Sequence, residues 1–391
     1  MKKEYKNGIV FKESFKEIKM QTLQFKDGQF KIMQIADVQE NAVPNPDTVS
    51  LIGLAIERER PDLVIFTGDQ VKGYSSSFKK DTLNKIENLL LSITEPIQKY
   101  KIPFAVTFGN HDRDCGISNR EQMKIYQKLD GCYIPDSRNQ GDPGTYCIPI
   151  KDSKGEKDIF CLYIIDSNAK DENGNYAPVS KEQIEWYKAE RDRLRSDNGT
   201  CLPALVFQHI PLPEYYKAIK KCSRFSKGRV EAFGSHKNEY YKLYDDSIAD
   251  GGFMLESPAS PEINNGEFEA FKEKGDVLGV FVGHDHNNSF VKNVDGIDLG
   301  YTQGAGFSTY GPGKKRGVRI FELSENNLTG YRTYTVTMDE LCRYTPSKPL
   351  SEFILSHAPS SVAQAKSTAK KLAAAAAICA SGFCLCKTIK K

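Results

Sequence analysis

Three short apolar runs in the first third of the chain each stop at a small group of polar residues. The runs cover residues 30–38, 62–67 and 103–108, and stretches with the apolar spacing of a helix separate them. This alternation is typical of a layered α/β architecture. Because the run 62–67 is almost unbroken, it predicts a strand that is covered on both faces. The folded part of the chain is therefore expected to begin with a βαβαβ unit.

The helices of this unit and of the later chain have recognisable starting points. Asp47 is predicted to cap the first helix, and a longer helical pattern extends from about residue 81 to about residue 100. Ser118 and Ser180 are each followed three residues later by Glu or Gln, a spacing that fits a capping box and predicts a helix start. Further strand-like runs lie at 145–150, 159–166, 204–208, 276–282, 289–294, 296–302, 318–323 and 331–337.

Length and composition indicate a globular protein with one large working domain. The chain has 391 residues, of which 39% are hydrophobic and 10% aromatic, and this is enough for a packed core. We assign the catalytic domain to residues 28–345, after an N-terminal extension at 1–27 and before a basic tail at 346–391. Residues 213–266 are rich in Lys, Tyr, Ser and Gly with little periodicity, which predicts a long surface excursion within that domain.

The charge is distributed unevenly and argues against nucleic acid as a partner. The chain has 54 Lys+Arg against 51 Asp+Glu, and six of the lysines lie in residues 353–391, which contain no acidic residue. The rest of the chain is therefore slightly acidic and lacks the basic field of a nucleic-acid-binding protein. The charged N-terminus has no apolar stretch of the kind that a secretory signal needs, so the expected location is the cytoplasm.

The cysteines outside the tail give no disulfide signal. They are scattered through a large domain without paired spacing, and the expected compartment is reducing, so we expect free thiols. These seven residues are Cys115, Cys132, Cys147, Cys161, Cys201, Cys222 and Cys342.

Several strand-like runs end in side chains that can bind a metal ion. In layered α/β folds, ligands bind beyond the carboxyl ends of the strands, so these separate segments are expected to converge on one crevice. Carboxylate, amide and imidazole groups together suit a pair of manganese, iron or zinc ions, whereas a magnesium or calcium cage would use oxygen alone. In chain order the residues are Asp37 and Gln39, Asp69, Asn110 with His111 and Asp112, His209, and His284 with His286.

The spacing within these groups also favours a two-metal site. His284 and His286 are two residues apart, so in an extended turn their rings can reach two different ions, and Asp69 can bridge both ions. Gly68, Gly109 and Gly283 flank the groups and allow the backbone to approach a metal or a phosphate closely.

The ordered set D-x-Q, G-D, G-N-H-D, H and G-H-D-H resembles the calcineurin-like metallophosphoesterase superfamily. Three strings resemble its purple-acid-phosphatase-like branch: I-A-D-V-Q at 35–39, H-I-P-L-P-E-Y at 209–215 and G-H-D-H-N-N at 283–288. The likeness extends over roughly residues 28–338, and five motifs in the same order are far more specific than any one of them.

The resemblance implies a four-layer α/β/β/α sandwich of two mixed sheets with two metal ions at one edge. The first ion would be held by Asp37, Gln39, Asp69 and His286, and the second by Asp69, Asn110, His209 and His284. His111 would protonate the leaving group, with Asp112 orienting its ring. A hydroxide that bridges the two metals would then attack the phosphorus in line, without a Ser or Cys nucleophile.

Two departures from the family pattern concern the metals. Gln39 stands where many members have a histidine, so the first ion loses a strong nitrogen ligand. Enzymes of the purple type place a metal-binding tyrosine three residues after the bridging aspartate, and Lys72 occupies that position here. We therefore expect a protein without purple colour.

The favoured function is metal-dependent hydrolysis of a phosphomonoester whose identity the sequence does not specify. A second hypothesis is a phosphodiesterase or nucleotide pyrophosphatase, because D-x-Q also occurs among superfamily members that cleave such bonds. A third is a non-catalytic scaffold, since some members have lost ligands and serve as binding modules. The complete ligand set of this chain disfavours the scaffold.

The tail leaves two interpretations open. Residues 372–386 form an uncharged, alanine-rich run between Lys371 and Lys387, shorter than the roughly 18–20 apolar residues that span a bilayer. The segment is either a frayed or disordered extension, or a weakly membrane-associated tail that could be acylated at Cys384 or Cys386.

Overall fold

The computed structural model describes residues 22–135 and 142–359 of the chain. Two large sheets form its centre, one of five strands and one of seven. The segment 372–386, for which membrane association was considered, lies outside the described residues. Among the described residues, no helix is both long and apolar enough to cross a membrane.

The first sheet contains the predicted βαβαβ unit. Its strand order is β15-β14-β1-β2-β3, and β1, β2 and β3 are parallel. The strands are β1 (Gln29–Ile35), β2 (Leu63–Thr67), β3 (Phe104–Thr107), β14 (Gly317–Ser324) and β15 (Asn327–Thr337). The helices that follow the parallel strands are α1 (Pro46–Glu59), α2 (Thr82–Lys99) and α3 (Asn119–Tyr126).

The second sheet is built from the middle and later chain in the order β10-β12-β13-β11-β6-β5-β4. Its strands β5, β6, β11 and β13 are parallel neighbours, and the outer pairs are antiparallel. The strands are β4 (Tyr146–Lys151), β5 (Asp158–Ile164), β6 (Ala204–Phe207), β10 (Phe253–Met254), β11 (Val277–Val282), β12 (Asn288–Val294) and β13 (Ile297–Tyr301). Its helices are α4 (Lys181–Asn198) and α6 (Glu267–Lys272).

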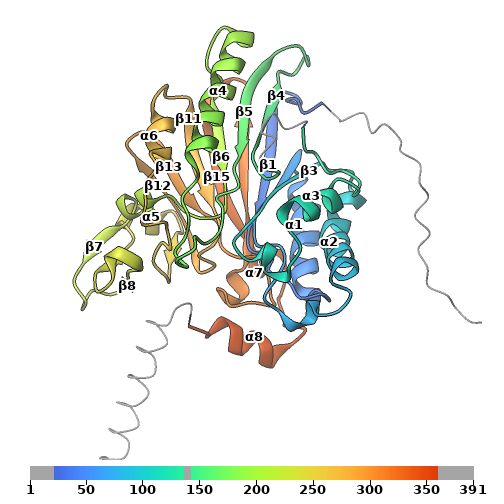
Figure 1. Ribbon diagram of the computed structural model, residues 1–391, viewed down its shortest axis with the longest axis vertical. Helices are drawn as coiled ribbons and strands as arrows, with labels where there is room; N and C mark the ends of the chain where they lie inside the picture. The colour runs from blue at the N-terminus through green and yellow to red at the C-terminus, as the bar shows by residue number, and fades with distance from the viewer. Residues whose placement is uncertain (1–21, 136–141, 360–391) are drawn as a thin grey trace, which may run out of the picture.

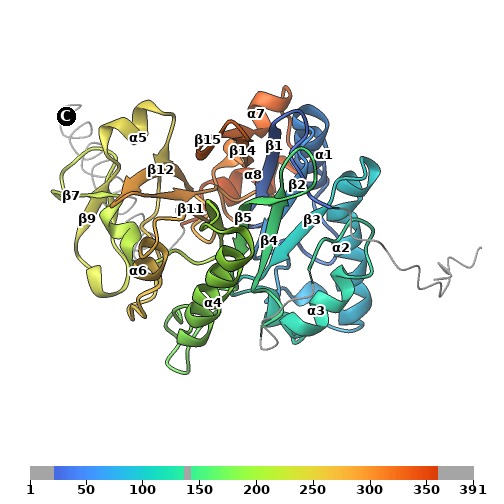
Figure 2. The ribbon, with the colours of Figure 1, turned by 90° about the horizontal axis from the view of Figure 1, so that it is seen from above.

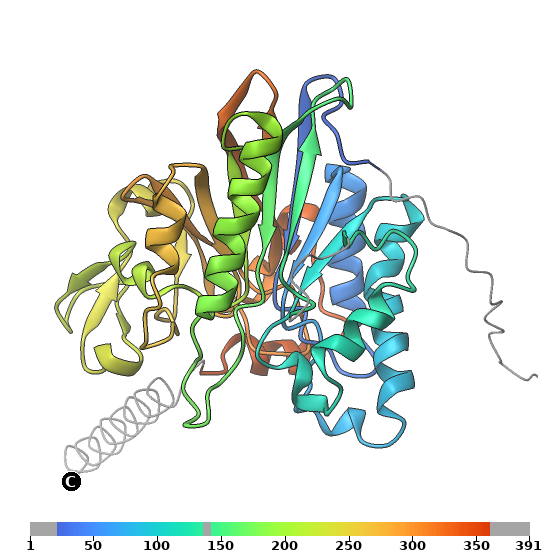
Figure 3. The same ribbon diagram turned by 45° about the horizontal axis from the view of Figure 1, so that its top comes forward.

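The two sheets pack against each other and carry helices on their outer faces (Figures 1 and 3). Seen from above, α1, α2 and α3 cover one side of the molecule, while α4 and α6 cover the other (Figure 2). Phe321 of β14 meets Phe207 of β6 and Phe281 of β11 edge to face, with ring centroids 5.2 and 4.5 Å apart. These rings join the sheets, and such pairs each add about 0.5–1.5 kcal/mol beyond the area they bury. The four-layer α/β/β/α sandwich is confirmed.

Helix starts agree with the sequence except at the first helix. Both capping boxes are present, with Ser118 and Ser180 each accepting a hydrogen bond from the backbone three residues on. The cap of α1, however, is Asn45 and not Asp47, because Asn45 has the extended backbone of a cap and its side chain accepts from the Asp47 N–H. Asp47 lies in the first turn, where its negative charge suits the helix N-terminus.

The excursion at 213–266 has more regular structure than its sequence predicts. It contains a three-stranded sheet of β7 (Lys220–Cys222), β9 (Tyr240–Lys242) and β8 (Val230–Glu231), followed by the short helix α5 (Asp245–Ala249). These strands have only two or three residues each. Elements this short show no detectable periodicity, which explains why the sequence indicates only an irregular segment.

Both predicted domain limits are too narrow. Leu23 and Phe25 are buried in the core, and the Phe25 N–H donates to the Lys151 carbonyl at 2.9 Å, so the folded chain begins before residue 28. After β15 the chain continues through α7 (Met338–Leu341) and α8 (Pro349–Ser356), and Glu352 of α8 lies 3.9 Å from the buried Arg316. The body therefore extends past residue 345.

The expectation of free thiols is wrong for one pair of cysteines. The structure joins Cys147 and Cys161 in a disulfide between the antiparallel neighbours β4 and β5. The two residues are not directly opposite in the ladder, since Cys161 pairs with Pro149, and a register of this kind cannot be read from cysteine spacing alone.

Candidate metal centre

The polar groups predicted to converge do lie at the strand ends of the two facing sheets. Asp37 and Gln39 follow β1 and Asp69 follows β2, all in the first sheet. His209 follows β6 and His284 follows β11, in the second sheet. Parallel strands place their carboxyl ends on the same edge, so the packing of the sheets brings the two sets together.

The backbone at these strand ends is turned sharply. Asp37, Gln39, Asp69 and His284 all have positive φ angles, of 51°, 37°, 54° and 71°. Non-glycine residues rarely adopt this left-handed conformation, and its strain is found mainly where surrounding structure imposes it. After these turns, Asp69 and Asp37 of the first sheet lie 3.4 and 3.3 Å from imidazoles of the second sheet, those of His209 and His286.

Asp69 and Asp37 are the buried carboxylates of the cluster, and imidazoles surround them. The His209 Nε2 atom lies 3.4 Å from Asp69 Oδ2 and 4.0 Å from Asp37 Oδ1. The His286 Nε2 atom lies 3.3 Å from Asp37 Oδ1, and the His284 Nδ1 atom is 3.3 Å from His209 Nε2. The ring nitrogens of these three histidines thus lie 3.3–4.0 Å from carboxylate oxygens or from one another.

Backbone carbonyls fix the orientation of two of these rings. The Nδ1 atom of His209 lies 2.9 Å from the Thr67 carbonyl oxygen, and that of His286 lies 2.9 Å from the Tyr310 carbonyl oxygen. A carbonyl only accepts, so Nδ1 carries a proton in both rings, and Nε2 is the atom that a metal ion would bind once that nitrogen has lost its own proton. This arrangement is the usual second interaction of a metal-binding histidine.

The donors fit a metal-binding role. Ligand atoms of Asp37, Asp69 and His286 all lie within 4.8 Å of one another, and all three side chains are buried. Asp37 Oδ1 and Asn110 Oδ1 are buried without a hydrogen-bond partner among the described residues. A buried oxygen without a donor is unfavourable by roughly 1–3 kcal/mol, so the cluster is incomplete without cations or protons.

The burial and charges of the cluster perturb its titration. Burial opposes ionisation of Asp69, but the neighbouring His209 outweighs it and lowers the pKa of Asp69. Burial likewise disfavours the charged form of His209, yet Asp69 and Asp37 raise the pKa of His209 to about 10. The imidazolium of His209 thus supplies positive charge beside Asp69, at the place where bound metal ions would also supply it.

Gln39 is not oriented as the predicted ligand. Its Nε2 donates to Asp69 Oδ2 at 3.0 Å, while its Oε1 accepts from Thr309 Oγ1 at 2.5 Å. The hydrogen bond from Thr309 therefore engages the amide oxygen of Gln39 that a metal ion would need. Turning the amide over would present Oε1 toward Asp69 instead, at the expense of the Thr309 hydrogen bond.

The predicted pair of His111 and Asp112 is also different in the structure. The Asp112 carboxylate accepts hydrogen bonds from the N–H groups of Asp69, Val71 and Gly109 at 2.7–2.9 Å, so it holds the backbone of two strand ends. The ring of His111 is held instead by Asp114, with 2.7 Å between Nδ1 and Oδ2. The side chain of His111 is 32% exposed, and its Nε2 atom is the ring nitrogen that Asp114 does not engage.

Glycines are required where carboxylates approach the backbone. A Cβ atom on Gly109 would overlap the Asp69 carboxylate, and one on Gly283 would lie 2.5 Å from Asp37 Oδ2. These glycines were predicted to let a metal or a phosphate approach the backbone; in the structure the site's own carboxylates approach it, and the approach of a metal or phosphate stays a prediction.

The sequence did not indicate the aromatic rim of the cluster. Tyr310 stacks on His286 at 4.3 Å, Tyr74 meets His111 edge to face at 4.8 Å, and Tyr176 meets His284 at 4.6 Å. Tyr176 comes from the loop before α4, which carries no strand-end signal.

Two charged residues near the site also differ in how far the sequence could indicate them. The sequence could have indicated Asp114 as the partner of His111, because it lies three residues after His111 in the same turn. Lys72 donates to the Ser308 carbonyl at 2.7 Å and is half-buried.

Comparison with known proteins assigns the chain to a family. The sequence model of calcineurin-like phosphoesterases matches residues 30–288, about two thirds of the chain and all the strand ends described above. The chain belongs to the calcineurin-like phosphoesterase family. The match ends at Asn288, so the last two strands of the first sheet and the helices α7 and α8 lie beyond it.

Relatives within this family carry purple acid phosphatase names. The chain is 29% identical over 339 residues to probable inactive purple acid phosphatase 14 of Arabidopsis thaliana, covering 76% of this chain and 75% of that protein. It is 26% identical over 336 residues to phosphatase DCR2 of Saccharomyces cerevisiae, covering 77% of this chain and 53% of that protein. The chain thus spans about half the length of the yeast protein.

Solved structures of the same general kind are more distant. A dimetal phosphatase from Danio rerio is 13% identical and covers 78% of this chain and 98% of its own, with a TM-score of 0.45. The assignment of the fold therefore depends on the two mixed sheets and the family match.

Proposed function

We propose that this protein is a phosphomonoesterase that works with two metal ions held at the shared edge of its sheets. The observation that carries the proposal is the donor set around Asp69. It combines partner-free oxygens of Asp37 and Asn110 with imidazole nitrogens that carbonyl groups have already oriented. Manganese, iron and zinc are the metals we propose, because the donors mix nitrogen with oxygen and include no thiolate.

The chain's own residues then have distinct tasks. When bound, the two metals would supply an activated water and neutralise charge on the phosphoryl oxygens. Asp69 would face both ions, while His209 and His286 would hold one each. His111 would carry a proton on Nε2 for the leaving oxygen, since Asp114 engages its other nitrogen. Its position at the exposed rim, beside Tyr74, suits contact with a leaving group.

The names of the relatives make the scaffold alternative a serious one. Three Arabidopsis relatives are named probable inactive purple acid phosphatases, whereas the yeast relative is named a phosphatase. Against the scaffold, this chain retains a carboxylate, amide or imidazole at each of the seven ligand positions. The weakest of them is Gln39, whose amide oxygen is engaged by Thr309.

Hydrolysis of an aryl phosphomonoester beside the matching diester tests the proposal. Purified protein would be stripped of metal, reconstituted with manganese, iron or zinc, and compared with the stripped form and with Asp69→Asn. A metal-dependent preference for the monoester supports the proposal. A preference for the diester would replace it by the phosphodiesterase hypothesis, and activity equal to Asp69→Asn on both esters would replace it by the scaffold.

A further inference from the structure

Helix α8, which lies at the lower end of the molecule in Figure 1, presents large apolar side chains to solvent. Leu350, Phe353 and Ile354 are 74%, 63% and 56% exposed. Their spacing of three and four residues places them on one side of the helix, and we call them the α8 face. Apolar residues exposed singly are ordinary on a protein surface, but three together on a helix of eight residues indicate a contact surface.

The charged side chain of α8 points inward. Glu352 is buried, and its carboxylate lies 3.9 Å from the guanidinium of the buried Arg316. Helix α8 therefore buries its acidic residue and exposes its apolar residues, whereas a surface helix normally does the reverse. This inverted polarity indicates that the α8 face meets another surface and not water alone.

The charge of the surrounding chain restricts what that surface can be. Arg343 and Lys348, which precede the helix, are exposed. Residues 341–391 contain eight Lys or Arg and one acidic residue, the inward-facing Glu352. A second copy of this chain would bring these cations against an identical set, and the segment 360–391 of the same chain would add further cations. An anionic surface is the partner whose charge is complementary.

We propose that the α8 face, together with Arg343 and Lys348, binds the surface of a membrane that contains anionic lipids. The apolar side chains would enter the boundary between headgroups and acyl chains, while the cations would stay among the headgroups. Stable attachment to a membrane surface takes two signals, and an apolar face beside a basic segment supplies both. The proposed surface belongs to a folded helix and is distinct from the uncharged run at 372–386.

Attachment through α8 would place the lipid surface at the end of the molecule that carries the metal centre. Arg316 connects α8 with the loop that contains Thr309 and Tyr310, because its Nη2 donates to the Thr309 carbonyl at 2.9 Å. Thr309 bonds to Gln39 and Tyr310 stacks on His286, so this loop borders the metal centre. The loop thus separates the proposed membrane surface from the proposed ligands.

Sedimentation of the full chain with lipid vesicles tests this inference independently of any phosphatase activity. Vesicles of phosphatidylcholine and phosphatidylserine in equal parts would be compared with vesicles of phosphatidylcholine alone. We expect binding to the mixed vesicles that high salt weakens, and much less binding to the neutral ones. The double variant Leu350→Ser/Phe353→Ser should weaken binding to the mixed vesicles by about tenfold or more, because two apolar side chains no longer enter the lipid.

Matched variants distinguish the α8 face from other apolar and basic groups. Phe225→Ser removes a side chain that is 79% exposed in the excursion, and it should bind vesicles like the wild type. Arg343→Gln/Lys348→Gln should lose much of the preference for phosphatidylserine. Phe353→Trp should show blue-shifted emission with the mixed vesicles, and this measurement serves if the double serine variant fails to fold.

Four outcomes would overturn the proposal. They are absence of wild-type binding to the mixed vesicles, unshifted emission of Phe353→Trp with these vesicles, and equal binding by the wild type and the double serine variant. Equal binding would assign the contact to another segment of the chain. Light scattering without vesicles supplies the fourth, since a wild-type dimer that the double serine variant converts to a monomer would make the α8 face an interface between copies.

Discussion

Gln208 and His209 are consecutive in the chain, yet they belong to two different polar clusters. His209 faces the first sheet and lies beside Asp69, whereas Gln208 faces the excursion and lies beside Glu267. The residues before them alternate in the same way, with Phe207 in the core between the sheets and Val206 in the core under the outer helices. Successive residues at this strand end thus point to opposite faces of the sheet and reach two different polar clusters.

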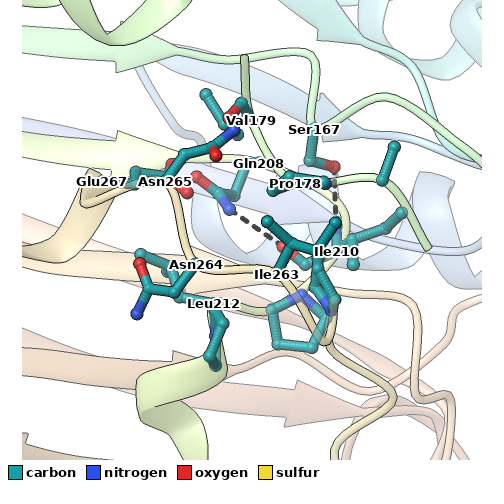
Figure 4. Close-up of a pocket in the computed structure, with 14 residues that line it drawn as sticks. Ser167, Pro178, Val179, Gln208, Ile210, Leu212, Ile263, Asn264, Asn265 and Glu267 are labelled. Carbon is teal, nitrogen blue, oxygen red and sulfur yellow. Dashed lines mark hydrogen bonds between the residues drawn. The ribbon is translucent and has the colours of Figure 1, made fainter. Parts of the chain in front are cut away.

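The two clusters differ in the groups that balance their carboxylates. The metal centre sets imidazoles against Asp37 and Asp69, so nitrogen donors are available and charge is partly compensated. The pocket beside Gln208 (Figure 4) is lined by one carboxylate, Glu267, and by amide side chains, with no imidazole among its lining residues. Nitrogen with oxygen suits transition metals, whereas a buried carboxyl without an imidazole holds its proton more tightly, so the comparison teaches that neighbouring residues of one strand end can lie in clusters of different charge balance.

Replacing the central carboxylate should give the largest effect and leave the cluster around Gln208 intact. In Asp69→Asn, loss of one negative charge shared by both proposed ions should lower turnover to the level of metal-stripped protein. Ester hydrolysis and metal analysis on the same preparation check this, with the circular dichroism spectrum as control for folding. Turnover well above that of metal-stripped protein would contradict the shared role of Asp69.

Removing the proposed proton donor should be the next largest effect. His111→Gln should keep metal content near the wild-type value, but lower turnover of an alkyl phosphomonoester by about 10²–10⁴-fold, the usual contribution of a general acid. An aryl ester with an acidic leaving group should lose much less, because its leaving oxygen needs less protonation. Metal analysis and kcat on both esters measure this, and an undiminished rate on the alkyl ester would remove His111 from the mechanism.

The partner of that histidine should have a smaller effect. Asp114→Asn removes a charged hydrogen bond of roughly 1.5 kcal/mol, equivalent to about a tenfold loss of turnover on the alkyl ester. Because Asp114 acts by holding the His111 ring, the loss should be confined to kcat on the alkyl ester, with KM, metal content and turnover of the aryl ester close to the wild-type values. Asp130→Asn, at an exposed position outside the cluster, is the control. Undiminished kcat on the alkyl ester in Asp114→Asn would assign the orienting role to another group.

The smallest effect concerns the stability that depends on Glu267. The pKa of Glu267 is raised from its ordinary value of 4.5 to about 8 by burial and then by the charge of Glu214, so the folded state holds this proton more tightly than the unfolded chain. Its contribution to stability is complete below pH 4.5 and is lost as pH rises to 8. The Tm of the wild type should fall over this range more steeply than that of Glu267→Gln. Parallel Tm curves for the two proteins would contradict this expectation.

The parts of the molecule that the sequence predicted are those with local signals. The strands around the metal centre are largely apolar runs, and the predicted ligand residues stand directly after them. The sequence therefore predicted both the strands and the convergence of the residues at their ends. The capping boxes at Ser118 and Ser180 are equally local. The cap of α1 was misplaced by two residues, because Asn45 and Asp47 are both good caps and only the backbone conformation distinguishes them.

Other features depended on contacts between distant segments. Thr309 turns the amide of Gln39 from 270 residues away, and Asp112 is engaged by backbone groups of β2's strand end, 41 and 43 residues away. The sequence names the groups but cannot say which of two nearby acids a histidine ring will meet. Side-chain orientation at this level is decided by packing, since several partners are chemically equivalent.

By itself the sequence determined the layered α/β fold, the edge at which the functional residues gather and the chemical types of their side chains. It did so because strand ends of parallel sheets meet at one edge whatever the connecting segments do. Only the tertiary structure decided that Asp114 and not Asp112 holds His111, that Tyr176 borders His284, and that Gln208 lies beside Glu267. Those pairings join residues without any common pattern, and the free energy that selects them comes from burial and hydrogen bonding in the folded chain.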